Sequence, residues 1–317
     1  MAQTILPEFL PRRGLPDAAA WHSASEPVLV PSRDGEVLSG YWHGAPSGSA
    51  RGVVIHLHGL EAEAASGHMR GISLLAHQAG FASLRLDWLG CGASRLTAGT
   101  LYHALRWHDL EAAVGWVSRR LPGLPVFLTG LSLGGAVALR WLSEMGEAAL
   151  PLVRGVVTIS APVDMGVAAR ALALPGNRIY ERWFLASMKR RLEAAARRDP
   201  QRWEEVARLG RAASSLTRFD DDVTARLAGQ RDAQAYYTLA SPRYALDRLK
   251  VPAFLIHAAD DPFVPPPENL PGHVKLILQP HGGHGGFWMA APVTFGPSVT
   301  TDRWAEGAAA RLIQTWA

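Results

Sequence analysis

The chain has 317 residues, of which 48% are hydrophobic and 19% are charged, and its formal net charge is +4. This is an ordinary globular composition, with enough length for one large core or two modest ones. Its arginines are scattered instead of forming a dense basic run, which argues against nucleic-acid binding, and its single cysteine, Cys91, excludes an intrachain disulfide.

The N-terminal residues and the lengths of the apolar runs bear on the cellular location of the protein. Residues 1–15 lack the apolar core of a secretory signal. No apolar stretch approaches the roughly 18 to 20 residues of a membrane span. We therefore expect a cytoplasmic protein without an integral membrane segment.

Short apolar runs alternate with helix-like segments through the first half of the chain. After an irregular, proline-punctuated arm at residues 1–25, strands are predicted at 36–42, 53–57, 81–86, 126–129 and 153–159. Helices are predicted at 69–78, at 103–120 and from residue 135 onward. Such alternation predicts an α/β fold, with a mostly parallel central sheet flanked by helices and functional loops at the carboxyl ends of the strands.

The pattern changes between Pro162 and Asp247, a stretch rich in arginine and alanine with no convincing strand. Apolar residues recur at helical spacing around Trp183 and Met188. A helical insert between two strands of a parallel sheet predicts a cap over an active site. Plain helical packing against the sheet is the alternative.

Strand-like patterns return after the helical stretch. Strands are predicted at 253–257 and 274–278, the latter as the last strand, and a closing helix at 303–316. The chain is thus divided into a first core part (1–161), a helical cap (162–247) and a second core part (248–317).

A Gly-x-Ser-x-Gly pentapeptide occupies residues 130–134, between a predicted strand and a predicted helix. On such a turn a serine is held in a strained conformation with its hydroxyl pushed out of the sheet. Glycines flank it because side chains there would clash with neighbouring backbone. The motif alone also fits a glycine-rich loop, but the strand–turn–helix context favours Ser132 as a nucleophile.

A nucleophilic serine needs a base, and the base needs an acid that orients it. In this fold the acid and then the histidine follow the serine along the chain. Asp260 and Asp261 both follow the strand at 253–257. Such enzymes often place the acid three residues after a small residue and three residues before a Val-Pro pair. Asp261 has this spacing from Ala258 and from Val264-Pro265. It is therefore favoured as the acid, with Asp260 as a turn-forming or capping residue.

Two histidines after the strand at 274–278 compete for the role of the base. His284 has a glycine pair on each side, which leaves its loop free to bring the imidazole to Ser132. His281 lies closer to the strand end and is interpreted as structural.

The oxyanion that forms on attack needs two N–H donors. The backbone N–H of Leu133 is expected to be one, and that of Leu60, in the loop His58-Gly59-Leu60, the other. An ordinary strand-to-helix turn is the alternative interpretation of His58-Gly59.

A metal site is a further possibility raised by His56-Leu57-His58, because zinc hydrolases often begin with His-x-His. Aspartate and histidine ligands should then follow closely, but residues 59–62 read Gly-Leu-Glu-Ala. We therefore expect neither a metal nor an organic cofactor. Cys91, between two glycines, is interpreted as a small buried loop residue, with a reactive thiol as the alternative.

Together these residues resemble the α/β-hydrolase superfamily. Within it, the chain is similar to the bacterial YheT-like esterase family, which is related to the ABHD1/ABHD3-type hydrolases. The resemblance runs from about residue 50 onward and is carried by His58–Glu61, Gly130–Gly135, Arg218–Asp220, Tyr236-Tyr237 with Ser241, Asp260–Phe263 and Gly282–Phe287. It implies Ser132, Asp261 and His284 as a catalytic triad. Asp220–Asp222 also fit a second interpretation, as N-terminal caps of a helix.

These observations predict a serine hydrolase that acts on carboxylic esters through an acyl-enzyme. The apolar cap suggests a small-molecule ester with a hydrophobic part. An acyltransferase using the same triad is the first alternative. A catalytically silent interaction protein is the second, and the intact triad argues against it.

Overall fold

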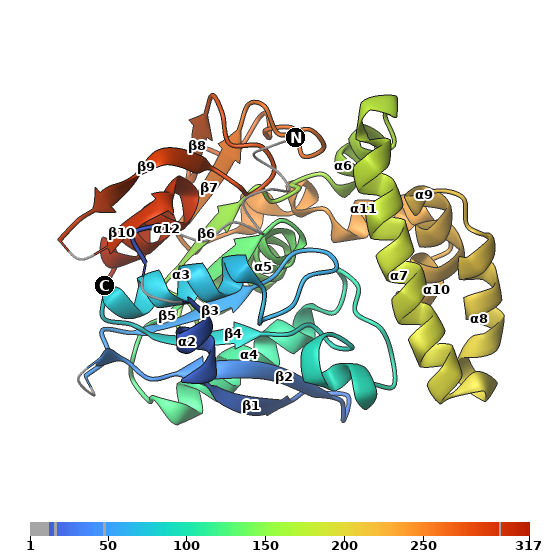
Figure 1. Ribbon diagram of the computed structural model, residues 1–317, viewed down its shortest axis with the longest axis horizontal. Coiled ribbons are helices and arrows are strands. Elements are labelled where there is room, and N and C mark those ends of the chain that lie inside the picture. Colours follow the sequence, from blue (N-terminus) through green and yellow to red (C-terminus); the bar gives the residue numbers. More distant parts are fainter. Residues whose placement is uncertain (1–12, 16–17, 47–48, 298) are drawn as a thin grey trace.

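A computed structural model describes residues 13–15, 18–46, 49–297 and 299–317 (Figure 1). Its centre is an eight-stranded sheet with the order β1-β2-β4-β3-β5-β6-β7-β8. β2 runs antiparallel to both of its neighbours, and the remaining pairs are parallel. The strands are β1 (Glu26–Pro31), β2 (Val37–His43), β3 (Val53–Leu57), β4 (Ala82–Leu86), β5 (Val126–Leu131), β6 (Gly155–Ile159), β7 (Ala253–Ala258) and β8 (Val274–Gln279). The predicted α/β fold with a mostly parallel sheet is confirmed.

Helices cover both faces of the sheet. One hydrophobic core holds residues of α4 (Trp107–Arg120) and α5 (Leu133–Met145), and a second holds residues of α3 (Gly67–Gln78) and α12 (Trp304–Gln314). Shorter helices are α2 (Ala18–Ser23), η2 (Gly92–Leu96) and η3 (Gly146–Ala149). None of the helices that the structure describes is both long enough and apolar enough to cross a membrane.

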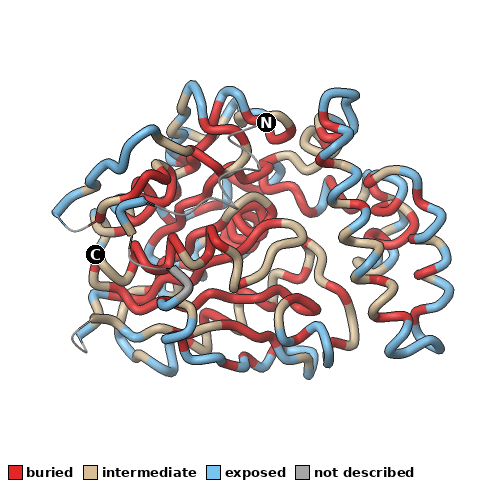
Figure 2. The backbone as a smooth tube through the Cα atoms, viewed as in Figure 1, coloured by how far each residue is buried: buried red, intermediate tan, exposed pale blue. Residues whose placement is uncertain are grey.

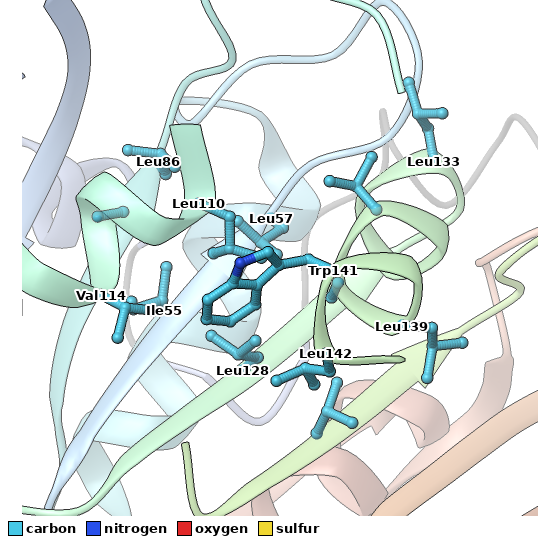
Figure 3. Packing of buried hydrophobic residues seen from close by; sticks show 14 of the residues in the cluster. Ile55, Leu57, Leu86, Leu110, Val114, Leu128, Leu133, Leu139, Trp141 and Leu142 are labelled. Carbon is cyan, nitrogen blue, oxygen red and sulfur yellow. The ribbon is translucent and has the colours of Figure 1, made fainter. Parts of the chain in front are cut away.

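Trp141 anchors α5 in the first of these cores. Its side chain is 1% exposed and lies among residues of the sheet, such as Leu128, and of α4, such as Leu110 (Figure 3). Truncating a buried tryptophan typically costs about 3–5 kcal/mol. This packing fixes the helix whose first turn directly follows Ser132.

Residues 160–252, between β6 and β7, form a helical insertion in which every residue is described and none is in a strand. Its elements are α6 (Met165–Leu172), η4 (Pro175–Asn177), α7 (Arg178–Arg198), α8 (Pro200–Ala212), α9 (Leu216–Phe219), η5 (Asp220–Thr224), α10 (Ala225–Leu227), α11 (Ala233–Ala240), η6 (Pro242–Tyr244) and η7 (Leu246–Arg248). Figure 2 shows burial concentrated in the sheet and α5, whereas the outer side of the insertion is largely exposed. The division into core and cap stays a prediction.

Two expectations from the sequence are wrong. The strand at 274–278 is not the last, because β9 (Trp288–Phe295) and β10 (Val299–Arg303) form a separate antiparallel pair after it. β9 consists almost entirely of apolar residues, so it shows no alternation of apolar and polar positions, and its Pro292 argues against a strand. The arm at 1–25 is not irregular throughout, since it ends in α2; residues 1–12 and 16–17 lie outside the described part.

Candidate active site

The carboxyl ends of the parallel strands meet at one edge of the sheet. Leu57 at the end of β3 is in register with Gly130 of β5, and Ile256 of β7 with Ile277 of β8. The loops that leave this edge carry Leu60, Ser132, Asp261 and His284. Residues more than 200 positions apart in the sequence are thus held on one side of a rigid sheet.

Ser132 occupies a sharp turn between β5 and α5. Its backbone has φ +51° and ψ −121°, a strained conformation for a residue with a side chain. The neighbouring glycines make the turn possible. A Cβ on Gly134 would overlap the carbonyl oxygen of Leu57, and one on Gly130 would overlap the backbone of Gly135. The turn is further held by the Ser132 N–H, which donates to the Ile159 carbonyl at 2.9 Å.

His284 lies between Ser132 and Asp261. Its Nε2 is 3.0 Å from the Ser132 hydroxyl, and its Nδ1 is 2.9 Å from the Asp261 carboxylate. The Phe263 ring packs on the imidazole, with ring centroids 4.2 Å apart. The Asp261 side chain is fully buried. Its second oxygen accepts the N–H groups of Phe263 and Val264 at 3.1 and 2.9 Å.

Asp260 contacts a different part of the histidine loop. One of its oxygens accepts the backbone N–H groups of Gly282 and Gly283, each at 2.8 Å, and the other is 3.3 Å from His281. Burial tends to raise the pKa of Asp260, but these backbone N–H groups and His281 hold it below its ordinary value. Asp260 therefore ties the histidine loop to the end of β7, and the structure does not bring it to the His284 imidazole.

The backbone beside Ser132 offers hydrogen-bond donors. Gly59 approaches so closely that a Cβ built on it would lie 3.1 Å from the Ser132 Cβ. In the part of the chain that the structure describes, the N–H groups of Leu60 and Leu133 have no hydrogen-bond acceptor. Both residues line the same cavity as Ser132. Two free N–H groups near a serine hydroxyl can stabilise a developing negative charge.

Ser132 lies where two cavities meet. One, of about 120 Å³, has mainly apolar walls, many of them from the insertion. The other, of about 680 Å³, is more polar and also reaches His284. Leu60, Glu61, Ser132, Phe184 and Arg191 line both cavities.

A buried acid of the helical insertion, Asp220, lines the apolar cavity. Asp220 accepts hydrogen bonds from the Tyr237 and Thr224 hydroxyls, each at 2.7 Å. Burial raises the pKa of Asp220 to about 6, and the two hydroxyls moderate the shift. The capping interpretation is wrong for Asp220, which lies inside a helical turn. Asp221 does accept the N–H of Ala233 at the start of α11.

His56 of β3 and His58 of the following loop form hydrogen bonds with other residues of the protein. His56 is 2.7 Å from the Thr129 hydroxyl and 3.2 Å from that of Ser83. His58 contacts the Gly59 carbonyl and accepts the Trp88 N–H. Burial lowers the pKa of His56 to about 3 and that of His58 to about 4, so both are neutral at pH 7.

Elsewhere in the described part of the chain, one group of side chains has the spacing of metal ligands. It consists of Asp34, His108 and Asp109. The Arg106 guanidinium donates to Asp34 at 2.9 Å and to Asp109 at 2.8 Å. The positive charge of Arg106 already neutralises these carboxylates, which argues against a metal cation there.

Sequence reasoning missed one feature of the site, a contact between its first loop and helix α7. Glu61, next to Leu60, forms a buried ion pair with Arg191. Glu61 was visible only as part of the loop motif. Arg191 stands among many arginines of α7, and no local pattern marks the one that turns inward.

Comparisons with known proteins found a family, related sequences and solved structures that this chain resembles. The alpha/beta hydrolase fold family matches residues 52–291. The protein named "Putative esterase YheT" of Escherichia coli (strain K12) is 30% identical over 90% of this chain and 83% of its own length. "Phospholipase ABHD3" of Mus musculus is 27% identical over 75% of this chain, which spans only 59% of that protein. The solved esterase Pf2001 of Pyrococcus furiosus has a TM-score of 0.53 at 19% identity, covering 86% of this chain and 90% of its own, and shows the shared fold.

Proposed function

Because the chain belongs to the α/β-hydrolase family, we propose that it hydrolyses carboxylic esters through an acyl-enzyme formed on Ser132. One observation carries the proposal. Asp261, His284 and Ser132 form a continuous hydrogen-bonded line that ends at the wall of an apolar cavity. Relatives named as an esterase and a phospholipase support the same reaction class.

In the first half of the reaction, the Ser132 oxygen attacks the ester carbonyl carbon while its proton moves to Nε2 of His284. Asp261 accepts the Nδ1–H of His284 and stabilises the imidazolium. The N–H groups of Leu60 and Leu133 donate to the oxyanion of the tetrahedral intermediate. When the carbon–oxygen bond to the alcohol breaks, His284 returns the proton to the departing oxygen.

In the second half, water replaces the alcohol. His284 takes a proton from the water as its oxygen attacks the acyl carbon, and the same N–H groups hold the second oxyanion. Collapse of this intermediate releases the acid, and His284 returns the proton to the Ser132 oxygen.

The two cavities suggest how the ester lies. An apolar cavity of about 150 Å³ holds a benzene molecule. The apolar cavity here, of about 120 Å³, therefore suits a short acyl group. The larger and more polar cavity leaves room for the alcohol part. In this arrangement the segment 162–247 acts as the cap that closes the acyl side.

Hydrolysis of p-nitrophenyl esters of graded acyl length tests this function. We expect turnover that is highest for short acyl chains and falls for long ones, and that is lost in Ser132→Ala at unchanged thermal stability. Activity that is absent at every chain length, or that survives in Ser132→Ala, would contradict the proposal.

A further inference from the structure

Glu61 has an unusual backbone for its residue type. It directly follows Leu60, and its φ is +56°, in the left-handed region that residues with side chains seldom occupy. Such a conformation persists only where the surroundings hold it. Because the Leu60–Glu61 peptide adjoins the proposed oxyanion donor, whatever holds Glu61 also restricts the directions that the Leu60 N–H can take.

The side chain of Glu61 is held by a full set of donors. It is 2% exposed, and Arg191 approaches it with Nε and Nη2, each at 3.2 Å. The Ser187 hydroxyl donates to it at 2.6 Å and the Tyr102 hydroxyl at 3.0 Å. The backbone N–H of Glu61 in turn donates to the Tyr102 hydroxyl at 2.8 Å.

Arg191 completes the connection from the other side. It lies on α7 of the insertion, as Ser187 does. Its Nη1 donates to the Gly90 carbonyl at 2.6 Å, so it also holds the loop after β4. Burial favours the neutral guanidine, but Cys91, Tyr102 and Glu61 together raise the pKa of Arg191 above its ordinary value. The guanidinium therefore stays charged throughout the working pH range.

We propose that the Glu61–Arg191 pair positions the loop His58–Glu61, which carries the Leu60 N–H, and makes the direction of this N–H depend on α7. The inference rests on the proposed function, because it concerns how the Leu60 N–H is aimed. Leu60, Glu61 and Arg191 line both cavities at Ser132, so the pair lies where the insertion meets the reacting groups. Glu61 and Arg191 are positioning residues, and neither is assigned a role in bond making.

Glu61→Gln and Arg191→Lys test this role. Glu61→Gln keeps an oxygen acceptor but loses the charge, and Arg191→Lys keeps the charge but loses the two-pronged contact. Glu193→Gln is the matched control, since it breaks a 2.8 Å ion pair with Arg211 on the solvent side of α7. The measurements are the rate at which a fluorophosphonate modifies Ser132, kcat and KM for a short-chain ester, and the thermal midpoint.

We expect Glu61→Gln to slow phosphonylation and kcat by roughly 100-fold, the usual effect of losing one oxyanion donor. KM should stay within about twofold, because the loss concerns the transition state. Arg191→Lys should show a smaller loss of the same kind, and Glu193→Gln none. If Glu61→Gln fails to fold, Arg191→Lys decides the matter.

A merely structural pair would give a different result. The thermal midpoint would fall, while the folded variants would be phosphonylated at the rate of the wild-type protein. That outcome would overturn the inference. A rise in KM alone would do the same. Failure of the wild-type protein to react with the fluorophosphonate at Ser132 would instead refute the proposed function, and this inference with it.

Discussion

Nδ1 of His284 lies 2.9 Å from the carboxylate of Asp261, whose side chain is fully buried. The adjacent carboxylate, that of Asp260, is 41% exposed and binds backbone N–H groups of the histidine loop. Two neighbouring acids thus have different surroundings, and their replacement by asparagine separates their roles.

Asp261→Asn is expected to lower kcat by about 10⁴-fold, because the amide favours the wrong tautomer of the base. Asp260→Asn keeps an oxygen that can accept the two glycine N–H groups. Its cost should be that of a weakened hydrogen bond, about fivefold. Steady-state kinetics on one short-chain ester checks both. A larger loss for Asp260→Asn than for Asp261→Asn would reverse the assignment of the acid.

Gly59→Ala is expected to reduce kcat by about tenfold with little loss of stability. The new Cβ would lie 3.1 Å from the Ser132 Cβ and 3.4 Å from the Leu131 carbonyl oxygen, so the loop or the serine must shift by a few tenths of an ångström. Small displacements of reacting groups are costly in rate. Gly272→Ala, where nothing lies within 4 Å, is the control. Equal kinetics for the two variants would argue against close placement of the loop.

Met188→Ala is expected to shift the preference toward longer acyl chains. Met188 lies on α7 and lines the apolar cavity, so its truncation enlarges the space beside Ser132. Ile179→Ala is the control, because Ile179 is 53% exposed on the same helix. The ratio of kcat/KM for octanoate and butyrate esters measures the effect. An unchanged ratio in Met188→Ala would place the acyl group elsewhere.

Stability is expected to fall as the pH drops from 7 to 5. Burial lowers the pKa of His56 to about 3 and those of His58, His103 and His257 to about 4. Between pH 6.5 and pH 4 the unfolded chain binds protons that these folded histidines do not, so each favours unfolding by about 2 kcal/mol at pH 5. The carboxyls of Asp87 and Asp220, with pKa values raised to about 6, bind protons in the folded state over this range and so stabilise it. These two carboxyls do not offset the four histidines.

His257→Leu tests this dependence at one position. Both ring nitrogens of His257 are buried without a hydrogen-bond partner among the described residues. The substitution should reduce the difference in unfolding free energy between pH 7 and pH 5 by about 2 kcal/mol. His273→Asn, on an exposed loop, should leave the difference unchanged. Urea denaturation at the two pH values measures it, and an undiminished difference in His257→Leu would contradict the expectation.

The sequence predicted well those parts of the fold that local patterns determine. β3 has the bounds, Val53–Leu57, that its short apolar run predicts, and the turn at Ser132 follows from glycines that cannot carry a side chain. β9 escaped prediction because its exposed residues give no periodic signal.

Prediction of the site was limited in a similar way. The order serine, acid, histidine along the chain pointed to three loops that the structure brings together. The partner of Glu61 could not be read from the sequence, because Arg191 lies 130 positions away and only the packing of α7 brings it inward.

Phosphonylation of the intact protein by a fluorophosphonate, followed by peptide mapping, tests the central claim most directly. The account predicts a single modification on Ser132 in the folded protein, and none in Ser132→Ala. Modification at another residue, or no modification of the folded protein, would contradict it.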